Sequence, residues 1–219
     1  LQLDGPFIVE NGAAVYIPVN HFKVQPQGTV LDKGYWVKSF CQTRDHWLSL
    51  LAQEASQYSK NFIGFDALSV EQLAELTGLT REKAAQAKTR QYSEPLHWSG
   101  DQATKSAFIE HMENFGANIL QGGRFLHVSG NCDKGQAQSW LSELYQVNTP
   151  SKKIISIALG DSNNDVAMLE AANIAVQVRS PVHDFPDLKR STEIHKSSEY
   201  GPAGWAECLQ KIIFSQIEQ

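Results

Sequence analysis

The stretch Gly-Asp-Ser-Asn-Asn-Asp at 160–165 constrains this chain more than any other, because it directly follows the apolar run 154–159. A short apolar run bounded by glycine is typical of a buried parallel strand. After the polar turn come Val166–Leu169, with helix-like composition, and a second apolar run at 174–178. Strand, turn, short helix and strand form a βαβ unit. The order predicts a parallel sheet whose polar turn lies at the carboxyl ends of the strands, where such sheets bind ligands.

The turn carries two carboxylates, Asp161 and Asp165. Carboxylate oxygens suit a hard cation such as Mg²⁺, which retains several waters, so the turn predicts a magnesium site. A simple helix cap remains the alternative, although capping accounts for one such residue and poorly for four polar residues in six. A calcium EF-hand is excluded, because Val166 stands where that loop needs glycine and Ala172 where it needs glutamate.

Composition and charge argue against nucleic acid or a membrane as the partner of this chain. The chain has 219 residues, 42% of them hydrophobic, and a formal net charge of −5, which gives nucleic-acid binding no electrostatic support. No apolar stretch approaches the roughly 20 residues that a membrane-spanning helix needs. The three cysteines are scattered and form neither a metal-binding spacing nor a disulfide framework, which favours a reducing cytosol. We therefore expect a cytoplasmic protein acting on a small molecule, with its oligomeric state open.

Apolar periodicity and turn signals outline the remaining elements. Strands are expected at 7–9, 13–17, 91–98, 117–120 and 124–128, and helices at 46–58, 69–77, 80–88, 105–115, 134–145 and 203–217. The βαβ pattern lies at the C-terminal end, whereas hairpins and helices mix in the middle. This arrangement predicts an α/β core interrupted by an α+β insertion. The five tryptophans are expected to be packing residues, because their spacing defines no platform.

Lys134 begins a predicted helix upstream of the carboxylate turn. A lysine at a helix start is unfavourably placed in the helix dipole, so we expect it to face an anion. A phosphate near a helix N-terminus is a natural partner. A solvated surface lysine is the alternative, and the nearby carboxylate turn favours the anion.

Polar residues of the middle segment are weaker candidates. Arg124 can clamp a carboxylate or phosphate, and alternation predicts that it shares a strand face with Leu126, opposite Phe125 and His127. For His127, a structural role is at least as well supported as ligand binding. Two more residues near Pro95 are candidates for reading sugar hydroxyls or a carboxylate, with a charged loop as the alternative: Arg90 and Glu94.

Together these residues resemble a known family. The motif at 160–165, preceded by Lys134-Gly135-x-Ala137, is similar to the last two motifs of the haloacid dehalogenase superfamily of phosphatases. Four shorter segments are similar to a narrower group, the mannosyl-3-phosphoglycerate phosphatases: residues 10–13, 93–95, 123–128 and 201–205. The carboxylate motif is specific for the superfamily, and the other segments point less strongly to the substrate.

The resemblance implies a Rossmann-like parallel-sheet core, residues 1–20 and 131–219, with an inserted α+β cap, residues 21–130. It implies a Mg²⁺-dependent phosphatase that hydrolyses a sugar–glycerate phosphate, mannosyl-3-phosphoglycerate, through an aspartyl-phosphate intermediate. Two alternatives stay open: a general sugar phosphatase of the superfamily, and a catalytically inactive module that binds sugar phosphates.

The resemblance also assigns roles to residues. Asp161 becomes the direct Mg²⁺ ligand and Asp165 the second carboxylate, while Lys134 stabilises the phosphoryl group and Asn164 lies near it. Four residues would bind the glycerate and sugar parts from the cap: Arg124, His127, Glu94 and Arg90.

One part of the family pattern is not found. The superfamily places its nucleophile and acid/base in an Asp-x-Asp-Gly-Thr motif, whereas Leu3-Asp4-Gly5 has one Asp and no partner two residues away. We therefore expect the nucleophile in a segment upstream of Leu1, without which the chain cannot run this chemistry.

Overall fold

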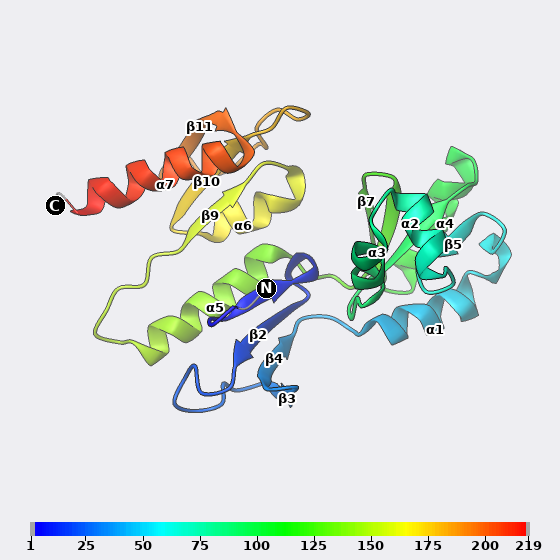
Figure 1. Cartoon of the computed structure of the whole chain (residues 1–219), viewed down its shortest axis with the longest axis horizontal. Helices are drawn as coiled ribbons and strands as arrows, with labels where there is room; N and C mark the ends of the chain where they lie inside the picture. The colour runs from blue at the N-terminus through cyan, green and yellow to red at the C-terminus, as the bar shows by residue number, and fades with distance from the viewer. Residues whose placement is uncertain (1–2, 218–219) are drawn as a thin grey trace. The chain divides into compact units, whose positions relative to one another are not determined.

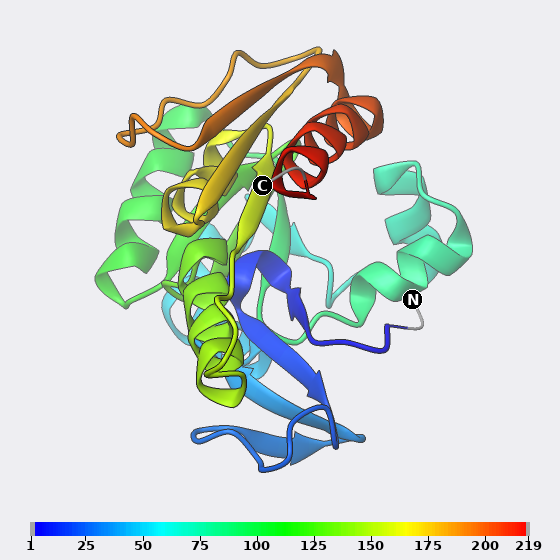
Figure 2. The same ribbon diagram turned by 90° about the vertical axis from the view of Figure 1, so that its left-hand side faces the viewer.

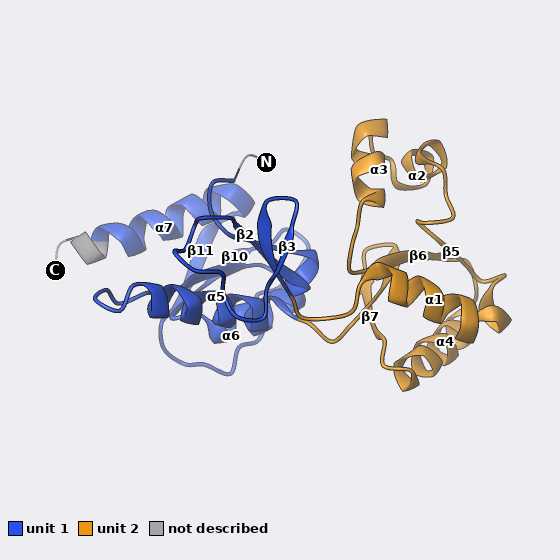
Figure 3. Ribbon diagram, turned by 90° about the horizontal axis from the view of Figure 1, so that it is seen from below, with its two compact units in different colours: residues 1–38, 133–219 blue, residues 39–132 orange. Residues whose placement is uncertain are grey.

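The chain folds into two compact units, described by a computed structural model for residues 3–217 (Figure 1). Unit 1 combines Leu1–Lys38 with Asp133–Gln219, and unit 2 is Ser39–Cys132 (Figure 3). The expected boundary at residue 20 is corrected, because residues 21–38 belong to unit 1. They do so because strand β4 (Tyr35–Ser39) lies beside β2 (Ala14–Pro18) in one sheet.

The C-terminal half of unit 1 is the predicted βαβ region. Strands β9 (Ile157–Gly160) and β11 (Ile194–Tyr200) both pair in parallel with the central β10 (Ile174–Arg179). Between β9 and β10 lie a 3-10 turn (Asn163–Asp165) and helix α6 (Val166–Ala171). The parallel sheet and the position of the carboxylate turn are confirmed. The strand β11 was not predicted, because polar residues dominate its sequence.

Helices cover both faces of this sheet. Helix α7 (Gly201–Ile217) covers one face (Figure 2). Its Cys208 and Ile212 pack against Ile174, Val176 and Val178 of β10. On the other face, Leu169 of α6 packs against Ala158 and Ala175. Successive strand residues point to opposite faces, so burial on both sides explains the unbroken apolar runs in the sequence.

A second sheet and one helix complete unit 1. The sheet has the order β1-β2-β4-β3, with β1 at Phe7–Val9 and β3 at Val30–Asp32, and a 3-10 turn (Glu10–Gly12) joins β1 to β2. Helix α5 (Lys134–Asn148) contacts β1, β2 and α6. It therefore links this sheet to the parallel one.

Two glycines allow the start of α5 to pack closely against its neighbours in unit 1. Gly12 has φ 96°, and a Cβ there would lie 2.1 Å from the Asp133 carbonyl oxygen. A Cβ at Gly135 would lie 2.3 Å from the Ala167 carbonyl oxygen of α6. Both distances are far inside van der Waals contact, so only glycine permits the approach. The first turn of α5 is thus fixed between the β1–β2 turn and α6.

Unit 2 is an antiparallel sheet with helices, as the α+β prediction requires. Its strand order is β5-β6-β8-β7, with strands at Phe62–Gly64 (β5), Glu94–Trp98 (β6), Asn118–Gly122 (β7) and Phe125–Ser129 (β8). Helices α1 (Arg44–Glu54) and α4 (Gln102–Asn114) share one core with Leu96, Leu126 and Val128 of the sheet. A 3-10 turn follows α1 at Ser56–Tyr58. A smaller core joins α2 (Val70–Thr77) and α3 (Arg81–Lys88) to Phe65 and Phe125.

No helix within residues 3–217 is both long enough and apolar enough to cross a membrane. Of the three cysteines, Cys132 and Cys208 are buried and Cys41 is partly exposed.

Candidate active site

The candidate site begins with an ion pair between two distant parts of unit 1. Lys134, the first residue of α5, places its Nζ 2.5 Å from Oδ1 of Asp165. Their side chains are 27% and 8% exposed. The prediction that Lys134 faces an anion therefore holds, with Asp165 as the anion present in the chain itself. A partly buried cation is thereby brought to the carboxyl end of β9 and held there.

The second oxygen of Asp165 closes the turn after β9. Oδ2 accepts from the backbone N of Asp161 at 3.1 Å and from the backbone N and the hydroxyl of Ser162, both at 3.3 Å. The capping interpretation is thus partly right, since Ser162 and Asp165 form a capping box. A Cβ at Gly160 would lie 2.4 Å from the Asp165 Cβ, so glycine is required for Asp165 to fold back onto the strand.

Asp161 differs from Asp165 in its surroundings. It is exposed, and its carboxylate makes no hydrogen bond with the residues that the structure describes. It lines a pocket of about 630 Å³ together with Lys134, Gly160 and Asp165. Asn164 is also exposed, and its Oδ1 accepts from the Ser162 hydroxyl at 2.6 Å. The turn therefore presents one free carboxylate beside a lysine.

This donor set fits a magnesium ion. Mg²⁺ is commonly bound through one or two carboxylates and keeps several waters, instead of being enclosed by protein ligands. Within residues 3–217 no three His, Cys, Asp or Glu side chains gather around one point. Asp161 is the available ligand, whereas both Asp165 oxygens already have partners. The resemblance made Asp161 the direct ligand and Asp165 the second carboxylate, and in the structure Asp165 also pairs with Lys134 and closes the turn.

The pocket also includes a residue that the sequence analysis assigned to packing. Trp205 in the first turns of α7 is 50% exposed and lines the pocket with Pro202 and Val178. The expectation that all five tryptophans are packing residues is therefore wrong for Trp205. The Gly-Pro-x-Gly-Trp segment that begins α7 was the available signal, and it places this aromatic side chain at the carboxyl end of the sheet.

In unit 2, Glu94 cannot contact a ligand, which corrects the prediction made for it. The residue is 0% exposed, and its Oε2 lies 2.5 Å from Arg44 Nε. Its Oε1 accepts from the backbone N of Asp66 at 2.8 Å. Arg44 also donates to the Lys88 carbonyl at 2.8 Å, so the pair ties α1 to α3 and β6. Burial without such partners would be costly, and this carboxylate is structural.

Arg90 and His127 are brought close together in unit 2. The pKa of His127 is lowered, first by burial of the ring and second by the positive charge of Arg90. Arg90 Nη1 donates to Ser93 Oγ at 3.2 Å, and its buried Nε has no partner among the described residues. The two side chains therefore form a partly buried basic pair, with His127 favouring its neutral form.

Arg124 lies in the turn before β8 and contacts α2. Its Nη2 donates to the carbonyls of Leu76 and Thr77 at 3.1 and 3.2 Å, which satisfies the C-terminal end of that helix. Its guanidinium lies 5.8 Å from the centre of the Phe125 ring. The expected pairing of Arg124 with Leu126 on one face is corrected, because Arg124 precedes the strand and turns toward α2.

Comparison with known proteins then identifies the family. Residues 1–183 match the haloacid dehalogenase-like hydrolases. The chain belongs to this family. The fold of this haloacid dehalogenase-like chain is also similar to solved structures. One, from Thermoplasma acidophilum, has a TM-score of 0.52 at 17% identity and covers 96% of this chain and 73% of its own. Another is a phosphatase of the superfamily from Bacteroides thetaiotaomicron, with a TM-score of 0.51 at 15% identity, covering 84% and 70%.

Curated relatives show where this haloacid dehalogenase-like chain lies within the family. A glucosyl-3-phosphoglycerate/mannosyl-3-phosphoglycerate phosphatase from Methanococcoides burtonii is 32% identical over 97% of the chain and 78% of that relative. A mannosyl-3-phosphoglycerate phosphatase from Pyrococcus furiosus is 30% identical over 84% and 72%. The resemblance to the mannosyl-3-phosphoglycerate phosphatase group is confirmed.

Proposed function

We propose that this chain is part of a Mg²⁺-dependent phosphatase that removes phosphate from a sugar–glycerate phosphate, mannosyl- or glucosyl-3-phosphoglycerate. The observation that carries the proposal is the Lys134–Asp165 ion pair beside the free carboxylate of Asp161, in one pocket at the carboxyl end of a parallel sheet. Membership of a hydrolase family and relatives named as phosphatases for these two substrates support it.

Lys134 supplies the charge that meets the phosphate. Its ammonium is a compact point charge with three donors, and Asp165 uses one of them. The remaining donors can face phosphoryl oxygens in the pocket. Because Asp165 fixes the side chain in advance, little reorganisation is needed as charge develops on those oxygens.

Asp161 would hold the magnesium ion, and Asp165 would be the second carboxylate of the site. When bound, Mg²⁺ supplies stabilisation of the negative charge on the transferring phosphoryl group. Asp161 is suited to this task because it is exposed and unpaired within the described residues, whereas Asp165 orients the lysine and closes the turn. Asn164, on the same turn, would lie near the phosphate.

The proposed reaction uses an Asp nucleophile that forms an aspartyl-phosphate, which water then hydrolyses. Asp165 is unsuited to attack phosphorus, because both of its oxygens are hydrogen-bonded. Asp161 is assigned to the cation. A second Asp near the nucleophile would protonate the leaving sugar–glycerate oxygen and then activate water.

Unit 2 would supply recognition of the organic part of the substrate. Arg124, Arg90 and His127 remain the proposed binding residues, whereas Glu94 is excluded by its burial. The buried, unpartnered Nε of Arg90 is the observation that favours a ligand in this unit. The neutral imidazole of His127 is suited to hydroxyl groups of a sugar, because it both donates and accepts hydrogen bonds.

We also propose a cytoplasmic location. The three cysteines are few and scattered in the sequence, which favours a reducing compartment. The substrate would be a small molecule made in the same compartment.

The experiment is a phosphate-release assay on the full-length protein with mannosyl-3-phosphoglycerate, glucosyl-3-phosphoglycerate and hexose phosphates, each with Mg²⁺ or with a chelator. The expected result is turnover that needs Mg²⁺ and prefers the glycerate-bearing substrates. Equal efficiency on hexose phosphates would replace the proposal with a general sugar phosphatase. Thermal stabilisation by the substrates without turnover would replace it with a binding module.

A further inference from the structure

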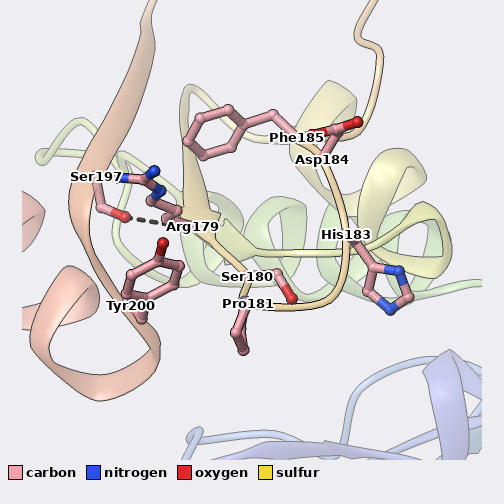
Figure 4. Close-up of a pocket in the computed structure, with 8 residues that line it drawn as sticks. All are labelled: Arg179, Ser180, Pro181, His183, Asp184, Phe185, Ser197 and Tyr200. Carbon is pink, nitrogen blue, oxygen red and sulfur yellow. Dashed lines mark hydrogen bonds between the residues drawn. The ribbon is translucent and has the colours of Figure 1, made fainter.

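A second pocket lies at the carboxyl ends of β10 and β11, outside the candidate active site. It has a volume of about 310 Å³ and is bordered by Arg179 of β10 and Tyr200 of β11 (Figure 4). The residues next to them in the chain, Val178 and Gly201, line the active-site pocket instead. The two pockets are therefore neighbours separated by the ends of β10 and β11. The loop after β10 supplies the remaining wall.

Arg179 is the main polar group of this pocket. Its guanidinium lies 4.9 Å from the centre of the Tyr200 ring, which orients the planar group. Its Nη1 donates to the Ser198 carbonyl through a long bond of 3.4 Å. Arginine has five N–H donors, and the others have no partner within the described chain. Figure 4 shows Arg179 beside Tyr200, with the Phe185 ring on the other side.

Backbone contacts keep Arg179 in place independently of any ligand. Its backbone N donates to the Ser197 hydroxyl at 2.8 Å, and that hydroxyl donates to the Glu199 carbonyl at 2.7 Å. Ser197 is buried, and its hydroxyl links the end of β10 to β11 next to Arg179. The open donors thus belong to a side chain whose base is fixed.

A second cation lies close to the pocket. Lys196 is not a lining residue, but its Nζ lies 5.0 Å from the centre of the Phe185 ring, which lines the pocket. Asp184 is the one carboxylate in the lining, and His183 is a further lining residue. Within the lining itself, Arg179 and Asp184 carry one charge of each sign, so it is the open donors of Arg179, and not a net positive charge, that favour an anion.

We propose that this pocket binds a small oxyanion, with Arg179 as its principal ligand and the hydroxyls of Ser180 and Tyr200 as further donors. A guanidinium fork matches the two oxygens of a carboxylate or phosphate. The size suits a molecule such as phosphate or glycerate. The anion has two chemical sources: the carboxylate of the substrate whose phosphate lies in the neighbouring pocket, or a separate free anion such as released phosphate. The first source rests on the proposed function, and the second does not.

The decisive measurement is site-resolved and needs no activity. The side-chain Nε–H resonance of Arg179 is assigned by its loss in Arg179→Gln, and the protein is titrated with sodium phosphate and with glycerate in the presence of a chelator. We expect this resonance to shift with saturation in the millimolar range. Arg190 is the internal reference, because its guanidinium already donates to the carbonyls of Leu169, Ala172 and Asn173. If Arg179 shifts no more than Arg190, the site does not exist.

Variants then identify the source of the anion. Arg179→Gln and Arg179→Lys are compared with Lys189→Gln, which removes a cation from the same loop outside the pocket lining. A severalfold rise in KM for the glycerate-bearing substrate, absent for an aryl phosphate, identifies the substrate carboxylate. Unchanged KM with lost inhibition by phosphate identifies a free anion. Unchanged anion binding in Arg179→Gln overturns the proposal, whatever the assay of the proposed function gives.

Discussion

Lys134 Nζ and Asp165 Oδ1 lie 2.5 Å apart, and this contact joins the first residue of α5 to the turn after β9. The two residues are 31 positions apart in the sequence. Gly12 and Gly135 allow the close packing that brings the helix start to the turn. The ion pair therefore depends on the packing of unit 1. Removing its lysine should change both the activity and the unfolding free energy, and the two can be measured separately.

Replacing Lys134 by Met should abolish most of the activity of the full-length protein. Loss of one preorganised donor to a developing oxyanion lowers kcat by about 10²–10³-fold. The variant should also lose about 1–3 kcal/mol of unfolding free energy, because it leaves the nearly buried Asp165 carboxylate without its cation. Kinetics and urea denaturation measure the two effects. Lys153→Met, an exposed lysine, is the control, and equal activity in both variants would remove Lys134 from the site.

Replacing Asp161 by Asn should abolish Mg²⁺-dependent turnover and leave the fold intact. The side chain is exposed and has no partner within the described chain, so its amide costs little stability. Thermal denaturation with and without Mg²⁺ provides a second measurement: the stabilisation by Mg²⁺ seen in the parent should disappear. Asp187→Asn, an exposed carboxylate outside the pocket lining, should retain both activity and the Mg²⁺ effect. Full activity in Asp161→Asn would disprove the metal assignment.

Local signals made the core of unit 1 predictable. The apolar runs that became β9 and β10 are buried from both faces, so their composition identifies them without knowledge of the fold. The turn between them contains its own capping box, and that too is encoded locally. Strand β11 escaped prediction because it lies at the sheet edge and buries only Ser197 fully. An edge strand buries fewer apolar side chains, so its sequence lacks the alternation of apolar and polar residues by which strands are predicted.

Long-range partners were not predictable. Nothing near Glu94 in the sequence indicates that Arg44, 50 positions away, forms an ion pair with its carboxylate. Arg124 likewise caps α2 from 47 positions away. For Glu94 a charged residue was taken for a ligand-binding group, because sequence alone cannot distinguish a satisfied charge from a free one. Arg124 stays a proposed binding residue. The same limit concealed Trp205, whose exposure depends on how α7 meets the sheet.

Replacing Glu94 by Ala should destabilise the protein strongly. Breaking a buried ion pair leaves Arg44 with an uncompensated charge, which costs about 3–5 kcal/mol. Urea denaturation measures the loss, and Glu110→Ala, an exposed glutamate on α4, is the control. The double variant Arg44→Met/Glu94→Leu should recover part of the loss, because neither charge then remains buried. A loss equal to that of the control would mean that Glu94 is not a structural residue.

His127 should make the stability of the protein depend on pH just below neutrality. Burial, and then the charge of Arg90, lower its pKa from the ordinary value of 6.5, so the folded protein binds the proton more weakly than the unfolded chain. Stability is therefore complete above pH 6.5 and falls as the pH drops toward the lowered value. Urea midpoints at about pH 7.5 and 5.5 should differ more for the parent than for His127→Gln. Arg90→Gln removes the second cause, so the His127 ring protons in NMR should titrate at a higher pH. A His127 titration at or above 6.5 in the parent would contradict this account.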